Sequence, residues 1–231
     1  MSYLERVFRA TEEENRRAVL ALLPAHRGGS MLDMGTSTGE FTMRVAARIG
    51  ASRVAGVELI GEHAGAARAR GIEVVSADLD EGLPFADGEF DTVNTNQVIE
   101  HVRRTDRFLS ELRRVLAPGG VACISTNNFS SWHNIGSLVL GYQPTPAHVS
   151  DEVILGNPLD PLRGQAHDDL GRTHLRLFTA RALTELCAHH GLETTLLRTV
   201  GYYPFPPLVG RVLARVDPLH GAFLAGLFRR S

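Results

Sequence analysis

Residues 31–40, MLDMGTSTGE, constrain the fold of this chain more than any other segment. An apolar run ends at Asp33, glycines follow at Gly35 and Gly39, and a helical pattern occupies residues 41–49. This order predicts a strand, a tight turn and a helix. Glycines adopt positive φ angles and let a ligand approach the backbone, and a helix start offers unpaired N–H groups and a positive dipole end. We therefore expect a nucleotide-like ligand at the carboxyl end of this strand, where open α/β sheets bind ligands.

The glycine spacing in this turn differs from the dinucleotide pattern G-x-G-x-x-G. Gly35, Ser37 and Gly39 form G-x-S-x-G, a pattern that also surrounds the nucleophile of α/β-hydrolases, with Ser37 in that role. A hydrolase needs an acid and a histidine at later strand ends as well. An acid at the end of the next strand fits a cofactor site better, and we favour that interpretation.

Glu58 is that acid. Residues 53–58, RVAGVE, form a second short apolar run that closes on a carboxylate, 25 positions after Asp33. A ribose-binding acid is expected near this distance in a βαβ unit. An ionised carboxylate accepts several hydrogen bonds, so it can bind both hydroxyls of a ribose. The alternative is a surface glutamate that merely ends a strand.

Hydrophobic periodicity continues the alternation of strands and helices along the chain. Strands are expected at residues 30–34, 53–58, 72–76, 90–94, 121–125 and 193–200. Helices are expected at residues 4–23, 40–49, 62–70, 105–116 and 178–190, with a short helical turn at 97–102. Such alternation predicts an α/β fold with a parallel sheet and helices on both of its faces.

We expect a single domain in four parts. Residues 1–29 are an N-terminal helical segment, 30–125 a cofactor-binding core, 126–177 a lid or acceptor insertion, and 178–231 a C-terminal helix, strands and tail. The insertion lacks a clean period, which is typical of lids and binding loops. Aromatic side chains from the insertion and the tail are candidates for an acceptor pocket or for packing of the tail: Trp132, Tyr142, Tyr202, Tyr203 and Phe205.

The tail, residues 208–230, is apolar and basic. Its valines, leucines and arginines recur at helix-like spacing, which indicates peripheral contact with a membrane surface. Pro218 and Gly221 interrupt the pattern and favour a short helical hairpin or a packed tail instead.

Composition excludes several classes of function. The net charge is −2, which implies no general affinity for nucleic acid or anionic membranes. All 24 basic residues are arginine, which excludes a lysine Schiff base. Cys123 and Cys187 lie in apolar contexts typical of reduced core residues. The first residues lack the pattern of a signal peptide, and no apolar run is long enough to span a bilayer, so we expect a cytoplasmic protein. We expect it to be a monomer or a homodimer.

The ordered motifs resemble those of the class I S-adenosylmethionine-dependent methyltransferases, of the small-molecule type found in quinone biosynthesis. They cover roughly residues 31–200 and read LDMGTSTGEFT, VAGVEL, ADLDEGLPF, FDTVNTNQVIEHV, FLSELRRVLAPGGVACISTNN and HLRLFTARALTELCAHHGLE. The resemblance implies a Rossmann-like fold with seven mostly parallel strands and the last one reversed, a position to which residues 193–200 match. It also implies S-adenosylmethionine as cofactor and a small-molecule acceptor.

The same resemblance implies residue roles. The turn would hold the methionine portion of the cofactor, although the family often has glycine where this chain has Ser37. Glu58 would bind the ribose hydroxyls, Leu59 would flank the adenine, and Asp78 would accept from the adenine amino group, with Leu79 beside it. The full implied set is Asp33, Gly35, Thr36, Ser37, Gly39, Glu58, Leu59, Asp78, Leu79, Asn96 and Gln97.

Methyl transfer from a sulfonium requires a positioned acceptor and the exclusion of water. An acceptor hydroxyl must also lose a proton, for which histidine is the usual base. Our candidates are His133, then His174, then His101, with packing as the alternative for each; His148 and His167 in the insertion are not ranked. Arg172 and Arg176 are candidates for pairing with an anionic acceptor. No two histidines have metal-ligand spacing on one helix, and metal-dependent relatives carry an acid where this chain has Gln97, so no metal is expected.

The expected function is therefore O-methylation of a small molecule with histidine-assisted deprotonation. One alternative is an enzyme of the same fold that uses the bound cofactor for cyclisation or decarboxylation. Another is methylation of nucleic acid, against which the near-neutral charge argues.

Overall fold

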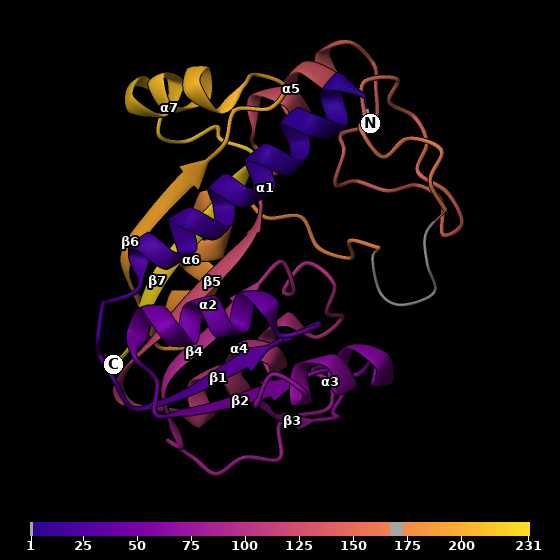
Figure 1. Ribbon diagram of the computed structural model, residues 1–231. Coiled ribbons are helices and arrows are strands. Elements are labelled where there is room, and N and C mark those ends of the chain that lie inside the picture. Colours follow the sequence, from indigo (N-terminus) through magenta and orange to yellow (C-terminus); the bar gives the residue numbers. More distant parts are fainter. Residues whose placement is uncertain (1, 167–172) are drawn as a thin grey trace.

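A seven-stranded sheet forms the centre of the molecule. The computed structural model describes residues 2–166 and 173–231, and in this part of the chain the strand order is β3-β2-β1-β4-β5-β7-β6 (Figure 1). Pairing is parallel except at β7, which runs antiparallel to both of its neighbours. The strands are β1 (Ser30–Met34), β2 (Arg53–Val57), β3 (Glu73–Val75), β4 (Phe90–Asn96), β5 (Leu116–Asn127), β6 (Leu192–Val200) and β7 (Phe223–Arg230). The predicted α/β fold of seven mostly parallel strands is confirmed.

Helices cover both faces of this sheet, as parallel strands require. The helices α1 (Tyr3–Leu22) and α2 (Glu40–Ile49) lie on one face (Figure 1). On the opposite face lie α4 (Thr105–Val115) and α6 (Ala180–His189). The helix α3 (Gly61–Arg68) flanks β3, whereas α5 (Trp132–Val139) and α7 (Pro207–Val216) lie near the upper end of the molecule in Figure 1.

Alternation along β1 shows how the sheet fills two cores. Met31 packs with Val45 of α2, whereas its neighbour Leu32 packs with Leu109 of α4. All four side chains are fully buried. Successive side chains of a strand point to opposite faces, so a strand covered on both sides is apolar at most of its positions, as β1 is at Met31, Leu32 and Met34.

The register of β1 and β2 brings the two predicted acids to the same edge of the sheet. Asp33 pairs with Gly56 and Met34 with Val57, so Glu58 follows β2 level with the turn after β1. The N–H groups of Gly35 and Thr36 both donate to the Val57 carbonyl, at 3.0 Å each. These bonds fix the turn against the end of β2.

The reversed strand corrects the sequence prediction for the C-terminal part. Residues 193–200 matched the family's reversed strand, but β6 lies at the edge of the sheet, and β7 is the strand that is inserted in reverse between β5 and β6. The tail is therefore a helix, α7, followed by an inner strand of the sheet, so it is a packed tail and not a hairpin of helices. Phe228 of β7 is fully buried.

Two local predictions also need correction. Residues 97–102 form turns and bends, not a helical segment. The insertion at 126–177 contains a helix, α5, which its irregular pattern did not reveal. No helix among the described residues is both long and apolar enough to cross a membrane.

Candidate active site

The turn after β1 has the backbone geometry that its glycines predicted. Gly35 has φ +87° and Gly39 has φ +81°, values that favour glycine. A Cβ on Gly35 would lie 2.4 Å from Cγ2 of Val98, so no larger residue fits there without displacement. Gly39 is the N-cap of α2 and provides no side-chain hydrogen bond to the helix start. Ser37 also adopts a left-handed conformation, with φ +49°, and exposes its side chain at the tip of the turn.

Asp33 lies at the base of the turn, and each oxygen of its carboxylate accepts a hydrogen bond. Thr42 of α2 donates to it at 2.5 Å, and Asn94 of β4 donates at 2.8 Å. Burial raises the pKa of Asp33 to about 6, against the opposing effect of these two hydrogen bonds. The carboxylate therefore ties β1, α2 and β4 together beneath the turn.

Glu58 is buried at the end of β2 and faces the same turn. One carboxylate oxygen accepts from the Ser37 N–H at 2.7 Å, and the other accepts from the Ile60 N–H at 2.9 Å. Two backbone donors thus hold the carboxylate beside the turn. An ionised carboxylate retains further acceptor sites for a ligand.

A crevice of about 460 Å³ opens above the turn. Six of the predicted cofactor residues line it: Asp33, Gly35, Thr36, Ser37, Asn96 and Gln97. Its wall also contains Glu12 and Arg16 of α1, which the sequence analysis did not single out. Leu59, Asp78 and Leu79 lie on the loops after β2 and β3, outside this lining, with Leu59 63% exposed.

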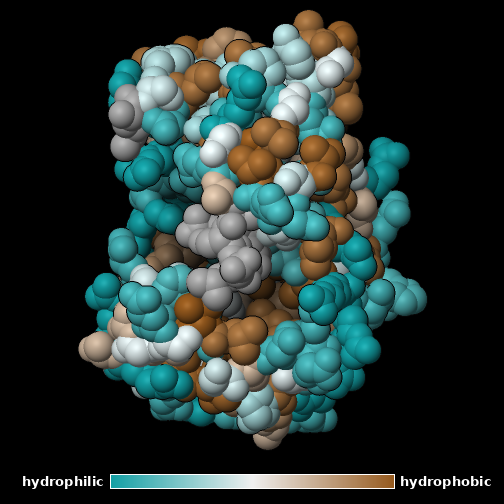
Figure 2. Space-filling view, turned by 90° about the vertical axis from the view of Figure 1, so that its right-hand side faces the viewer, coloured by the Kyte–Doolittle hydropathy of each residue, from teal (hydrophilic) through white to brown (hydrophobic). Residues whose placement is uncertain are grey.

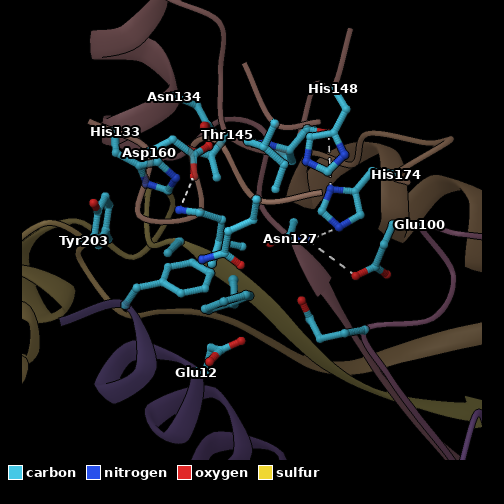
Figure 3. A pocket seen from close by; sticks show the side chains of 18 of the residues that line it. Glu12, Glu100, Asn127, His133, Asn134, Thr145, His148, Asp160, His174 and Tyr203 are labelled. Atoms are coloured by element: carbon cyan, nitrogen blue, oxygen red, sulfur yellow. Dashed lines mark hydrogen bonds between the residues drawn. The ribbon is translucent and has the colours of Figure 1, made fainter. Parts of the chain in front are cut away.

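A second cavity, of about 320 Å³, adjoins the crevice, because Glu12 and Gln97 belong to both linings. Figure 3 shows Glu100, Asn127 and His174 on one side of this cavity and His133, Asp160 and Tyr203 on the other, with Glu12 of α1 between them. The remaining lining includes His101, His148, Thr145 and several apolar side chains from the insertion. All three candidate bases therefore border one cavity, which is the size of a small-ligand pocket.

Figure 2 views the molecule from the side on which the insertion lies. Hydrophobic residues gather in the middle of this face, between margins that are mostly hydrophilic.

His133 lies on the α5 side of the cavity. Its ring meets the Tyr203 ring edge-on, with 5.4 Å between the ring centroids. Burial lowers the pKa of His133 to about 4, so the ring is neutral at physiological pH. A base with so low a pKa has little driving force to take a proton from a hydroxyl near pH 7.

Glu100, His101 and His174 form a cluster on the other side. One ring nitrogen of each histidine and one carboxylate oxygen of Glu100 lie within 4.8 Å of one another. The Glu100 carboxylate is buried, and this burial raises its pKa to about 7. Thr126 donates to one of its oxygens at 2.8 Å, and Asn127 donates to the other at 3.4 Å. Burial also lowers the pKa of His101.

Several predicted site residues lie elsewhere. Trp132 and Phe205 are about half exposed, and of the five aromatic candidates only Tyr203 lines the second cavity. Arg176 is exposed and donates to the Arg103 carbonyl at 2.7 Å, away from the cavity lining. The candidates His167 and Arg172 lie outside the described residues.

Comparison with known proteins identifies the family. A family model described as a methyltransferase domain matches residues 3–197. The chain belongs to the methyltransferase domain family. The match extends from α1 into β6, so it includes both acids, the crevice and most of the lining of the second cavity. S-adenosylmethionine is the cofactor of this class, and the expected resemblance is confirmed.

Relatives of this methyltransferase domain differ in the acceptor that their names state. Demethylmenaquinone methyltransferase of Thermobifida fusca is 38% identical over 110 residues, which are 46% of each chain. Norajmaline N-methyltransferase of Rauvolfia serpentina is 38% identical over 103 residues, which are 42% of this chain and 35% of the relative. The chain thus spans less than half the length of these curated relatives.

Solved structures agree on the fold of the methyltransferase domain. A methyltransferase of Thermotoga maritima, described as a possible histamine N-methyltransferase, has a TM-score of 0.62 at 21% identity, with 98% of this chain and 94% of that chain covered.

The crevice of this methyltransferase domain fits its cofactor. The left-handed Ser37 and the uncapped start of α2 leave backbone available to a ligand at the tip of the turn. Glu12 and Arg16 supply both signs of charge, as the zwitterionic end of an amino acid requires. The donor set of the turn therefore suits S-adenosylmethionine.

One part of the site that sequence reasoning missed is the polar network beneath α1. Asn15 donates to the Asn96 side chain at 3.1 Å and accepts from Ser125 at 2.9 Å, and Gln97 donates to Ser125 at 3.2 Å. Asn15 is 2% exposed, on the face of α1 that packs on the sheet. A polar residue at a core position of an amphipathic helix was the available signal.

Proposed function

We propose that this methyltransferase domain transfers a methyl group from S-adenosylmethionine to a hydroxyl of a small-molecule acceptor. The observation that carries the proposal is the adjoining pair of cavities, a crevice over the glycine turn and a histidine-lined pocket, which share Glu12 and Gln97. A reaction between two bound molecules needs such a junction, because the reacting atoms must meet without intervening water.

The cofactor site we propose is the one that the sequence implied. The turn from Asp33 to Gly39 holds the methionine portion, Glu58 holds the ribose, and the loops that carry Leu59, Asp78 and Leu79 surround the adenine. Gln97 lies at the junction of the two cavities, and Asn96 precedes it in the wall of the crevice. The contacts of Asp33 with Thr42 and Asn94 support a positioning role for its carboxylate beneath the turn.

When bound, S-adenosylmethionine supplies a methyl group that is already activated by a sulfonium. The remaining work of the chain is to orient the acceptor, exclude water and remove a proton. The insertion, residues 126–177, provides much of the cavity wall, which supports its assignment as the acceptor lid. Tyr203 and Phe8 add apolar surface against which an aromatic acceptor can pack.

Among the three candidate histidines we favour the pair beside Glu100. His133 has a pKa of about 4, too low for an effective base near pH 7. His101 and His174 border the same cavity and lie beside a buried carboxyl group, which is the usual neighbour of a catalytic histidine. Burial lowers the pKa of His101 as well, so within this pair we assign the assistance of deprotonation to His174.

A direct assay tests the proposal. Protein is incubated with S-adenosylmethionine labelled on the methyl group and with matched phenol, catechol, amine and carboxylate acceptors. We expect S-adenosylhomocysteine and a labelled methyl ether. If only the amine acquired the label, the enzyme would be an N-methyltransferase and the proposal of O-methylation would be wrong. Cofactor turnover without any methylated product would contradict methyl transfer.

The exposed face of α7 supports peripheral membrane contact as a further part of the proposal. Leu208, Val212 and Val216 are exposed along this helix, which also carries Arg211 and Arg215. Apolar side chains flanked by arginines suit the surface of an anionic bilayer. Flotation with anionic liposomes should recover the native protein and less of Val212→Glu, whereas Ala69→Glu, beside α3, should behave as the native protein.

A further inference from the structure

We infer that the acceptor of this methyltransferase domain carries a positively charged amino group, which binds in the second cavity between the Asp160 carboxylate and the rings of Phe8 and Tyr203. The inference rests on the proposed function, because it names the chemical class of the molecule that enters this cavity. The reacting hydroxyl would lie at the other end of that molecule, near Gln97 and His174, which line the same cavity.

The described lining of the second cavity carries negative charge without a compensating cation. It contains the carboxyl groups of Glu12, Glu100 and Asp160 but no arginine, in a chain whose 24 basic residues are all arginine. Within the described part of the chain, no ion pair joins an arginine to any of these carboxyl groups. Arg9 and Arg16 act on Glu12 only at longer range. A buried carboxylate is costly unless it is paired, so a cationic ligand supplies what the cavity lacks.

Asp160 is well placed to bind such a ligand. It is 7% exposed, and its burial raises its pKa. Its Oδ1 accepts from the Leu162 N–H at 2.8 Å, and the Thr145 side chain donates to the same carboxyl group. An ionised carboxylate has about four acceptor positions, so further positions remain for the N–H groups of an ammonium. A cation beside the carboxyl group would favour its ionised form and lower its pKa again.

Three aromatic rings border the same cavity. Phe8 meets Tyr203 edge-on, with 6.0 Å between the ring centroids, and the centroids of Phe8 and Phe223 are 6.5 Å apart. Burial raises the pKa of Tyr203, and the nearby charge of Asp160 adds to this effect. The Tyr203 hydroxyl donates to the Leu159 carbonyl at 2.9 Å, which fixes its ring. Aromatic faces attract cations, and groups of such rings bind alkylated ammonium ions.

His133 does not supply the missing positive charge. Burial lowers its pKa to about 4, so the ring that meets Tyr203 is neutral near pH 7. Figure 3 shows Asp160 and Tyr203 on the side of the cavity opposite Glu100. Glu12 of α1 lines both this cavity and the crevice, so negative charge extends from the amino-group site toward the cofactor.

Matched phenols test the inference through binding alone. Protein saturated with S-adenosylhomocysteine is titrated calorimetrically with tyramine, para-ethylphenol and para-hydroxyphenylacetate. These probes share a phenol ring and a two-carbon substituent, and they differ in the charge at its end. We expect tyramine to bind at least about tenfold more tightly than para-ethylphenol, because charge-assisted hydrogen bonds are the stronger ones. The carboxylate probe should bind most weakly.

Asp160→Asn should remove this preference. We expect it to bind tyramine at least about tenfold more weakly than the native protein and to bind para-ethylphenol almost unchanged. The asparagine oxygen can still accept from the Leu162 N–H, and an unchanged affinity for S-adenosylhomocysteine shows that the variant is folded. Asp151→Asn is the matched control, because Asp151 is an exposed acid of the same insertion, and it should bind tyramine as the native protein does.

Three results would each overturn the inference: no binding of tyramine, equal affinities for tyramine and para-ethylphenol, or equal tyramine affinity in the native protein and Asp160→Asn. Methylation of para-ethylphenol as readily as of tyramine would also overturn it and would leave the proposed O-methylation intact. Selective binding of tyramine without methyl transfer to any acceptor would support the amino-group site and contradict the proposed function.

Discussion

Single side chains at the carboxyl edge of the sheet decide whether the turn after β1 can receive a ligand. The Glu58 carboxylate holds the N–H groups of Ser37 and Ile60, and Asp33 holds Thr42 and Asn94. Both carboxylates are buried, so each hydrogen bond is formed where water competes little. Substitutions here should alter ligand affinity and stability through identifiable bonds.

The Glu58→Gln variant should bind S-adenosylhomocysteine at least about tenfold more weakly. The amide nitrogen of glutamine cannot accept a hydrogen bond, so the bond from the N–H of Ser37 or of Ile60 would be lost. A hydrogen bond to a charged group is worth about 1.5–3 kcal/mol. Calorimetry measures the affinity, with the exposed Glu62→Gln on α3 as the control. Equal affinities for the native protein and Glu58→Gln would contradict the ribose assignment.

Asp33 should make the stability of the fold depend on pH. Burial raises its pKa from 3.8 to about 6, so between these values the folded state holds a proton that the unfolded state releases. Its contribution to the free energy of unfolding therefore increases as the pH falls from 7 to 5, by about 1 kcal/mol. Urea unfolding at both pH values should show the native protein gaining this amount relative to Asp33→Asn. A difference that does not change with pH would show that Asp33 does not titrate in this range.

At the scale of elements, the turn between β1 and α2 depends on glycines for two separate reasons. Gly39 has a positive φ, and a Cβ there would lie 3.1 Å from Cα of Ala67 in α3. Gly65 in α3 has open space around it and an ordinary helical position. The two glycines therefore form a matched pair for substitution.

Gly39→Ala should destabilise the fold by about 2 kcal/mol or more, because strain at positive φ adds to the contact with α3. Gly65→Ala should stabilise it by about 0.5–1 kcal/mol, since alanine loses less backbone entropy in a helix. Chemical denaturation distinguishes the two signs. If Gly39→Ala were as stable as the native protein, α3 would have to move away from the new Cβ at little cost in free energy.

At the scale of the whole molecule, β7 joins the cofactor half of the sheet to β6. It pairs with β5 on one side and with β6 on the other, so residues 223–230 form an inner strand that connects the edge strand β6 to the rest of the sheet. Its Phe228 packs in the same core as β1, β4 and α4. The C-terminal strand is therefore part of the main core.

Phe228→Ala should lower the free energy of unfolding by about 3–5 kcal/mol through loss of buried surface and the cavity that remains. Phe205→Ala, at a ring that is about half exposed, should cost less than about 1 kcal/mol. Urea denaturation measures both values. Similar costs at the two positions would contradict the assignment of Phe228 to the main core.

The sequence alone determined the turn and its surroundings, because their signals are local. A glycine that needs positive φ, an acid that closes a strand and the period of a helix can each be recognised within a short stretch of sequence. It did not reveal β7, since periodicity alone does not distinguish a short apolar run in a strand from one in a buried helix. Only the tertiary structure joined Glu100 to His174, 74 positions later, through backbone hydrogen bonds that no local pattern encodes.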